Sequence, residues 1–275
     1  MTEPIEEEKG ASFFSHFTFL PEYYFYTDII SFHNQKNKLF EEVYFFESNT
    51  KFEAMFFSYK EDLFFGTFFM TILGMGKQYE DIVLDPRDVY YALTPFFELR
   101  RWDLTLQAGL DHRCIHEVDR KTGPTIYWNQ LYTKIASRVR PGLFQWHHKN
   151  QEVPWDPMSR LSWSFSFGYY LPGFFGLIRP ALVNGGHNMR FESIINLKYA
   201  LHRTDSWLFS TSHMTRLNLN ENGTGYWSGM FGLEATVNQS GNGLTFFTRY
   251  NYDFPRERPF YSKDKLIELG MRFFF

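Results

Sequence analysis

The last eleven residues of the chain alternate between two kinds of side chain. One parity is apolar and the other is mostly polar, as in Ile267, Leu269, Met271, Phe273 and Phe275 against Glu268, Gly270, Arg272 and Phe274. Successive side chains of a β-strand point to opposite faces, so this period of two predicts a strand with one apolar face. Such a strand must place its apolar face against a protein core or against lipid.

The same alternation recurs in four further segments, which span residues 161–171, 189–201, 229–237 and 244–254. Charged side chains keep to one parity in these segments. A charge that faces lipid costs about 2–4 kcal/mol at the middle of a membrane, so a lipid-facing surface demands this separation. Before residue 100 the pattern is less regular, because pairs such as Phe56-Phe57 put aromatic residues on both faces.

The composition favours a membrane barrel. Aromatic residues make up 21% of the chain, yet its mean hydropathy is negative, at -0.37. No run of about 18 apolar residues occurs, so no transmembrane helix is expected. Aromatic residues without helical hydropathy are typical of a barrel with aromatic girdles at both membrane interfaces. We therefore predict an all-β fold, a transmembrane antiparallel β-barrel of about 12 to 14 strands.

The links between the predicted strands alternate in length. Long links are expected near residues 255–264, 218–224, 184–188, 150–158, 115–124 and 76–88. Short links are expected near residues 240–243, 202–205, 172–173, 139–142 and 102. Outer-membrane barrels have short periplasmic turns and longer external loops, so this alternation supports the barrel and places the long links outside.

The barrel is predicted to span residues 38–275. Residues 1–37 fit the pattern less well and are assigned to an N-terminal extension or plug, or to extra strands. The final strand, with its terminal Phe275, resembles the closing strand of bacterial outer-membrane β-barrels, which implies location in the bacterial outer membrane. The acidic segment after Met1 contains no apolar leader, so we expect the sequence to be a mature form with an added Met.

Two global features exclude other classes. The formal net charge of -3 argues against a nucleic-acid-binding protein. Cys114 is the one cysteine of the sequence, so no disulfide can form within the chain.

Three polar residues interrupt the apolar parity of two neighbouring predicted strands. In residues 103–114, His112 and Cys114 continue the parity of the apolar residues that precede them. In residues 126–135, Asn129 shares its face with leucine and isoleucine. Polar groups that face lipid are costly without partners. We therefore predict that His112, Cys114 and Asn129 form a hydrogen-bonded cluster at the outer leaflet.

The same residues resemble the outward-facing Ser-His-Asn triad of the outer-membrane phospholipase A family. His112-Arg-Cys114 resembles the element that carries His and Ser, and Trp128-Asn129-Gln-Leu-Tyr-Thr133 resembles the stretch that carries Asn. The match covers about residues 108–135, and the link at 115–128 is a few residues longer than in the family. The resemblance implies a hydrolase of membrane lipids that works as a calcium-bridged homodimer, with His112, Cys114 and Asn129 as catalytic residues.

The chemistry of such a triad is clear in principle. Cys114 would attack a lipid ester carbonyl, and His112 would act first as general base and then as general acid. Asn129 would hold the imidazole in the required tautomer, and Tyr127 and Leu131 would be neighbouring lipid contacts. Cys114 departs from the serine of the family, and a thiol in apolar surroundings can be inert. A non-enzymatic barrel with a degenerate site is therefore the alternative.

The calcium ligands are not assigned by the resemblance. Glu117 and Asp119 could supply oxygens, but neither aligns with a known ligand of the family, so the metal site is unknown. A second resemblance links His112, Cys114, His116 and Asp119 to uncharacterised barrel proteins with a His-x-Ser-x-His-x-x-Asp pattern. No established activity accompanies that pattern.

Two functions of other classes compete with the hydrolase. A passive barrel would be a channel or a structural protein, and a channel would use lumen-facing residues such as Arg190, Glu192, Lys198, Glu234 and Arg249. A soluble β-sandwich that binds carbohydrate would also show alternation, and the aromatic residues on both faces of the early strands favour it mildly. The terminal Phe275 and the ordered link lengths oppose the sandwich.

Overall fold

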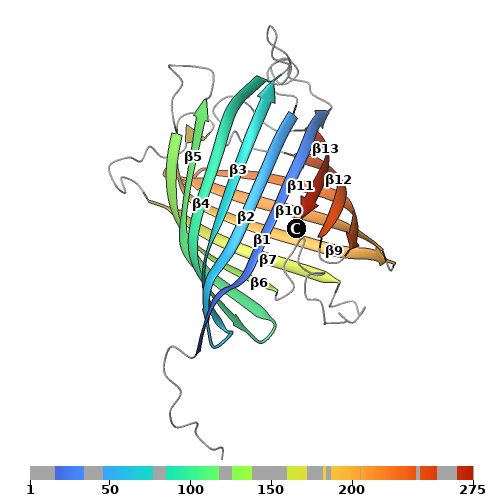
Figure 1. Ribbon diagram of the computed structural model, residues 1–275. Helices are drawn as coiled ribbons and strands as arrows, with labels where there is room; N and C mark the ends of the chain where they lie inside the picture. Colours follow the sequence, from blue (N-terminus) through green and yellow to red (C-terminus); the bar gives the residue numbers. More distant parts are fainter. Residues whose placement is uncertain are drawn as a thin grey trace, which may run out of the picture.

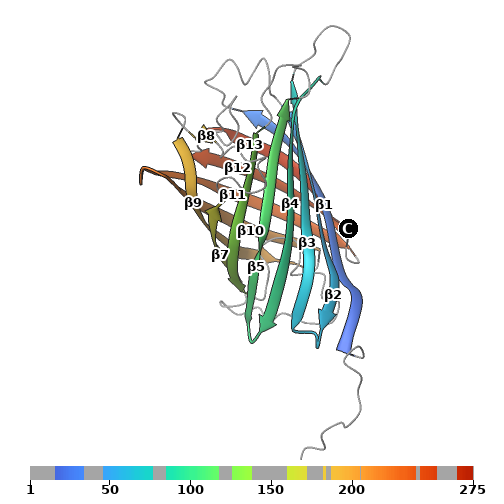
Figure 2. The same ribbon diagram turned by 90° about the vertical axis from the view of Figure 1, so that its left-hand side faces the viewer.

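The structure is a computed structural model that describes residues 16–33, 46–76, 85–117, 126–137, 160–171, 182–183, 187–204, 206–239, 242–252 and 265–274. In this part of the chain, twelve antiparallel strands form a closed ring (Figures 1 and 2). The first six are β1 (Phe17–His33), β2 (Phe46–Tyr59), β3 (Leu63–Gly76), β4 (Asp85–Arg101), β5 (Leu104–Glu117) and β6 (Ile126–Ser137). The other six are β7 (Leu161–Tyr170), β9 (His187–Arg203), β10 (Trp207–Asn220), β11 (Gly225–Gln239), β12 (Asn242–Tyr252) and β13 (Ile267–Phe274). The short strand β8 (Leu182–Val183) pairs with the start of β9. The predicted antiparallel barrel is confirmed, at the lower end of the predicted strand number.

Burial alternates along the strands between the lumen and the outer surface. In β13, Glu268 and Arg272 are 3% and 9% exposed, whereas Leu269 is 45% exposed. The same contrast recurs in β11 between buried Glu234 and exposed Leu233. No helix in the part of the chain that the structure describes is long and apolar enough to cross a membrane. Charged residues buried inside and apolar residues exposed outside reverse the arrangement of a water-soluble protein, so the outer surface is suited to lipid.

The barrel closes between β1 and β13. The two strands pair from Tyr26 opposite Phe274 to His33 opposite Ile267, and β1 also pairs with β2. Strand β1 is therefore part of the ring and lies in the segment 1–37, for which extra strands are one of the predicted alternatives. The register of β1 shifts near its start, where Leu20 has a φ of 46°, and this irregularity hides the strand from a search for alternation. Residues 1–15 and 34–37 lie outside the described residues.

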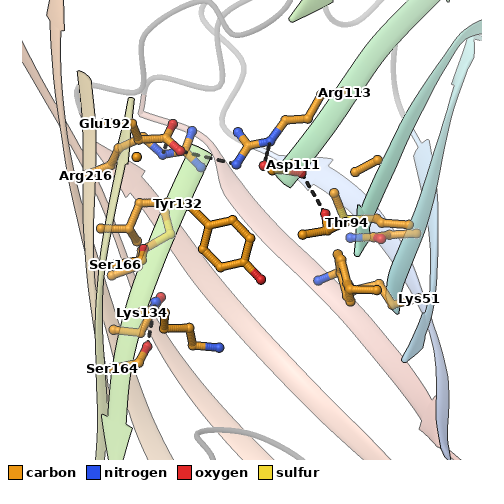
Figure 3. A pocket seen from close by; sticks show the side chains of 18 of the residues that line it. Lys51, Thr94, Asp111, Arg113, Tyr132, Lys134, Ser164, Ser166, Glu192 and Arg216 are labelled. Atoms are coloured by element: carbon orange, nitrogen blue, oxygen red, sulfur yellow. Dashed lines mark hydrogen bonds and ion pairs between the residues drawn. The ribbon is translucent and has the colours of Figure 1, made fainter. Parts of the chain in front are cut away.

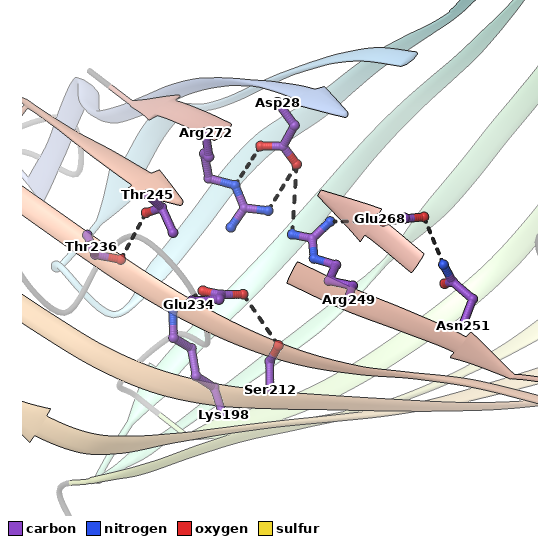
Figure 4. A network of polar contacts seen from close by, with 10 residues as sticks. All are labelled: Asp28, Lys198, Ser212, Glu234, Thr236, Thr245, Arg249, Asn251, Glu268 and Arg272. Atoms are coloured by element: carbon purple, nitrogen blue, oxygen red, sulfur yellow. Dashed lines mark hydrogen bonds and ion pairs between the residues drawn. The ribbon is translucent and has the colours of Figure 1, made fainter. Parts of the chain in front are cut away.

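Paired charges fill the lumen beside this closure (Figure 4). Arg249 of β12 lies 3.7 Å from Glu268 of β13, counted between Nη1 and Oε2. Lys198 of β9 donates a hydrogen bond to Glu234 of β11 at 2.8 Å. A buried charge without a partner is strongly destabilising, so the polar inner face depends on these pairs.

The inner wall formed by β2 to β4 carries apolar side chains beside polar ones such as Glu47 and Thr94. Met55, Phe64 and Phe96 are buried together, and Phe68 packs against them. Phe69, the next residue along β3, is 37% exposed and faces outward. Neighbouring phenylalanines are thus divided between the lumen and the lipid face, which explains why the alternation is less regular before residue 100.

Three short turns lie at one end of the barrel. They join β2 to β3 at residues 60–62, β4 to β5 at 102–103 and β9 to β10 at 204–206. The predicted short links at 139–142 and 172–173 lie outside the described residues. In the described ranges, β7 pairs antiparallel with both β6 and β9.

Candidate functional site

Strand β5 carries two of the predicted site residues on its outward face. Leu106 is 47% exposed, whereas Gln107 is 9% exposed and lines a cavity in the lumen. Even-numbered residues of β5 therefore face outward, and His112 and Cys114 belong to this set. The predicted parity of these two residues agrees with the structure.

Asn129 meets His112 from the neighbouring strand. In β6, Leu131 is 52% exposed and Gln130 is 2% exposed, so Asn129 shares the outward face with Leu131. His112 lies directly opposite Asn129 in the antiparallel register, and His112 Nδ1 is 2.7 Å from Asn129 Oδ1. Because a carbonyl oxygen can only accept, the hydrogen lies on Nδ1, and Nε2 is left as the basic nitrogen.

Cys114 lies on the same face, two residues along β5 from His112. Its side chain is 7% exposed, and its thiol forms a hydrogen bond with the backbone of Tyr91, its register partner on β4. The ring of Tyr91 meets the ring of His116 edge-on, with 5.8 Å between centroids. Sequence reasoning missed Tyr91 because it follows another tyrosine, Tyr90, so that both faces of β4 are aromatic at this level. The outward surface thus gathers His112, Cys114, His116 and Tyr91 next to Asn129.

The residues predicted to supply oxygens for a metal lie at the edge of the described chain. Glu117 ends β5, and its backbone pairs with Asp88. The Glu117 side chain, the Tyr127 side chain and Asp119 lie outside the described residues. Within the described ranges, no group of three or more His, Cys, Asp and Glu side chains is arranged to hold a metal ion. Glu117 and Asp119 therefore stay predictions as oxygen donors.

The opposite face of β5 is held by a buried ion network in the lumen (Figure 3). Arg113 donates to Asp111 at 2.5 Å and to Glu192 of β9 at 3.2 Å. Thr94 of β4 donates to Asp111 at 2.7 Å, and Arg216 of β10 lies 3.6 Å from Glu192. The parity of Asp111 and Arg113 predicts that they face the lumen, as observed. Glu192, the second partner of Arg113, lies 79 residues further along the chain, and no local pattern indicates this contact.

The network borders a cavity of about 540 Å³ in the lumen. Lys51 of β2 and Lys134 of β6 project into the cavity from opposite walls, and the Tyr132 hydroxyl points into the space between them (Figure 3). Glu192 and Arg249, two of the residues predicted for a channel, line the same cavity.

The other three residues predicted for a channel differ in their surroundings. Lys198 and Glu234 are buried and bonded to each other in the lumen. Arg190 is exposed near the start of β9, where its guanidinium lies 5.5 Å from the centre of the Phe191 ring. Four of the five predicted residues are therefore buried inside the barrel.

Comparisons with known proteins find similarity in structure. No protein-family model and no curated protein matches the sequence. The chain is similar to outer membrane phospholipase A from Escherichia coli, with 11% identity over 92% of this chain and 89% of that chain, and a TM-score of 0.51. It is also similar to the outer membrane phospholipase dimer with bound calcium from Salmonella typhi, with 12% identity, the same 92% and 89% coverage, and a TM-score of 0.52.

The chain resembles outer membrane phospholipase A in its fold. The likeness covers nearly the whole barrel, whereas the resemblance in sequence is confined to β5, β6 and the link between them. With the apolar outer surface, it confirms the predicted transmembrane barrel of the bacterial outer membrane.

Proposed function

We propose that the chain is a lipid acyl hydrolase, with Cys114 as nucleophile, His112 as general base and Asn129 as the residue that orients the imidazole. The observation that carries this proposal is the 2.7 Å hydrogen bond between His112 and Asn129 on the outward face of the barrel. Polar side chains that face hydrocarbon are rare and mark functional sites. Cys114 follows His112 by two residues on the same face of β5.

The reaction would pass through a thioester. Cys114 Sγ gives its proton to His112 Nε2 and attacks the carbonyl carbon of a lipid ester, which forms a tetrahedral oxyanion. Collapse of the oxyanion breaks the carbon–oxygen ester bond, and the imidazolium returns the proton to the departing alcohol. Water then gives a proton to His112 and attacks the thioester, which releases the fatty acid and restores the thiol.

Asn129 suits this role in a membrane. An anionic carboxylate beside hydrocarbon would be expensive, whereas a neutral amide is not. Its oxygen keeps the hydrogen of His112 on Nδ1, so that Nε2 can accept the proton of the nucleophile. The amide therefore supplies the tautomer control of a triad without a buried charge.

Calcium and a homodimer enter the proposal through the likeness to the Salmonella typhi phospholipase, a dimer with bound calcium. Glu117 and Asp119 are the oxygen donors to test, because both follow the site residues of β5 in sequence. We expect chelation of calcium to lower hydrolysis, and Glu117→Gln and Asp119→Asn to weaken its recovery when calcium is restored. Sedimentation in detergent with and without calcium measures the dimer.

The direct test is release of fatty acid from phospholipid in mixed detergent micelles. Cys114→Ala and His112→Ala should abolish release, whereas Cys114→Ser should keep part of it, because a hydroxyl beside the same base is also a competent nucleophile. His202→Ala is the matched control, since His202 is an exposed histidine on β9. Absence of release with and without calcium, or equal release by the Cys114→Ala protein, would contradict the proposal.

A second candidate function is a channel for small solutes, and the charged cavity of about 540 Å³ favours it. Lys51 and Lys134 project into that cavity and would contact a passing ion (Figure 3). The test is stepwise conductance in planar bilayers, altered in ion selectivity by Lys51→Glu or Lys134→Glu. A silent wild-type protein that is shown to be inserted would remove the channel.

A further inference from the structure

A second polar pair faces lipid on another part of the barrel. His213 of β10 and Tyr252 of β12 form a hydrogen bond of 2.7 Å between Nε2 and Oη, and their rings lie nearly parallel at 15°. His213 has the same parity in β10 as Phe209, and Tyr252 has the same parity in β12 as Tyr250. Phe209 and Tyr250 are each 41% exposed, so both members of the pair face outward. In the ring of strands, β10 is separated from β5 by β6, β7 and β9. The pair is therefore distinct from the site around His112.

The pair spans three strands because of a glycine. Tyr252 lies across Gly229 of β11, and a Cβ atom at Gly229 would overlap the Tyr252 ring and hydroxyl. The absence of a side chain at Gly229 thus lets the phenol reach over β11 to His213. Trp227, two residues from Gly229 toward the β10–β11 turn, is 61% exposed on the same parity. Outward tryptophans gather at the level of the lipid headgroups, so the pair lies close to that level.

The hydrogen bond between the two side chains leaves one donor unused. If the Tyr252 hydroxyl donates to Nε2, the hydrogen of His213 lies on Nδ1 and has no acceptor in the pair. If Nε2–H donates to the hydroxyl oxygen, the hydroxyl hydrogen is left over. Among the residues that the structure describes, their mutual bond is the one hydrogen bond that either side chain makes. In either tautomer the pair therefore offers a hydrogen to an acceptor from the membrane.

We propose that His213 and Tyr252 bind the polar end of a membrane lipid through an ester carbonyl or a phosphate oxygen. These are the acceptors that a lipid presents at the boundary between headgroup and acyl chain. Phe231 and Leu233 follow Gly229 on the outward parity, away from the turn, and are 46% and 47% exposed. They would contact the acyl chain of the bound lipid, while the pair fixes its head.

Native mass spectrometry of the detergent-purified barrel tests this site with diacyl phosphatidylglycerol as the probe. A Cys114→Ala background keeps the lipid intact, so the result does not depend on hydrolysis. Tyr252→Phe, which keeps the ring over Gly229, and His213→Leu should each lower the fraction of barrel that retains a lipid by about three- to tenfold, the size expected for one membrane hydrogen bond. Tyr250→Phe is the matched control and should retain lipid like the parent protein.

A dialkyl ether lipid with the same headgroup distinguishes the two acceptors. Loss of its retention assigns the bond to the ester carbonyl, and equal retention assigns it to the phosphate. Folding of each variant is checked by its electrophoretic mobility before and after heating, and His213→Leu decides the outcome if Tyr252→Phe does not fold. Equal retention by the folded variants and the Tyr250→Phe control overturns the proposal.

Discussion

Arg272 and Asp28 join the last strand of the barrel, β13, to the first, β1. They are direct partners in the register of β13 and β1, although they lie 244 residues apart in the chain. Arg272 donates two hydrogen bonds to the carboxylate of Asp28, at 2.6 and 3.0 Å. Asp28 is fully buried and Arg272 is 9% exposed, so the pair is enclosed in the lumen at the strand pairing that closes the ring.

Loss of either partner should weaken this closure. Asp28→Ala leaves Arg272 buried without the carboxylate that it contacts, and we expect the free energy of unfolding to fall by about 3–5 kcal/mol. Arg272→Ala should cost less, because Arg249 still lies 4.0 Å from Asp28. Urea titration of tryptophan fluorescence in lipid vesicles measures the change. Arg203→Ala is the control, because Arg203 is exposed at the end of β9 and exposed ion pairs contribute about 0–1 kcal/mol. An effect of Asp28→Ala no larger than the control would show that backbone pairing alone holds the closure.

A charge on the outer surface should interfere with folding into a bilayer. Leu233 lies midway along β11 and is 47% exposed, so Leu233→Arg would place a guanidinium in the apolar belt. We expect a cost of about 2–4 kcal/mol in the free energy of folding into lipid vesicles. Glu221→Arg in the exposed β10–β11 turn is the comparison and should cost little. Equal costs at the two positions would mean that Leu233 does not face lipid.

A side chain at Gly66 should destabilise the wall between β2 and β4. A Cβ atom there would lie 2.6 Å from the backbone oxygen of Ala54 and 2.9 Å from Sδ of Met55. The backbone atom cannot move without disturbing the strand pairing, so Gly66→Ala should lower the free energy of unfolding by about 1–3 kcal/mol. At Gly225 the nearest atom is the end of the flexible Leu219 side chain, 3.2 Å away. Gly225→Ala should therefore be tolerated in the same urea titration, and a similar loss in both variants would contradict this explanation.

The sequence predicts the fold best where the two faces differ in polarity. Glu268, Leu269 and Arg272 show the contrast between lumen and lipid within a few residues, and β13 is found where the alternation places it. For the first strand the sequence leaves an extension, a plug and extra strands open, because the register shift that follows Phe19 interrupts its alternation.

The candidate site is predictable from the sequence only where the parity of side chains determines it. The parity of His112 and Asn129 indicates a shared face, and antiparallel neighbours joined by one link can lie opposite each other. The contact of Cys114 with Tyr91 depends on the register between β4 and β5, which no local pattern fixes. The contact of Arg113 with Glu192 requires the curved sheet of the barrel, because it joins β5 to β9 inside the lumen, past β6 and β7.

Asn129 offers the sharpest test of the proposed chemistry. Asn129→Leu keeps the size of the side chain but removes the oxygen that accepts from His112 Nδ1. The imidazole could then adopt the other tautomer or turn away, so we expect kcat for fatty acid release to fall by at least about tenfold, with KM changed little. Thr133→Val is the control, since Thr133 is an exposed residue on the same face of β6. If both variants hydrolyse lipid at the parent rate, the bond between His112 and Asn129 has only a structural role. The proposal that Cys114, His112 and Asn129 act as a catalytic triad would then be contradicted.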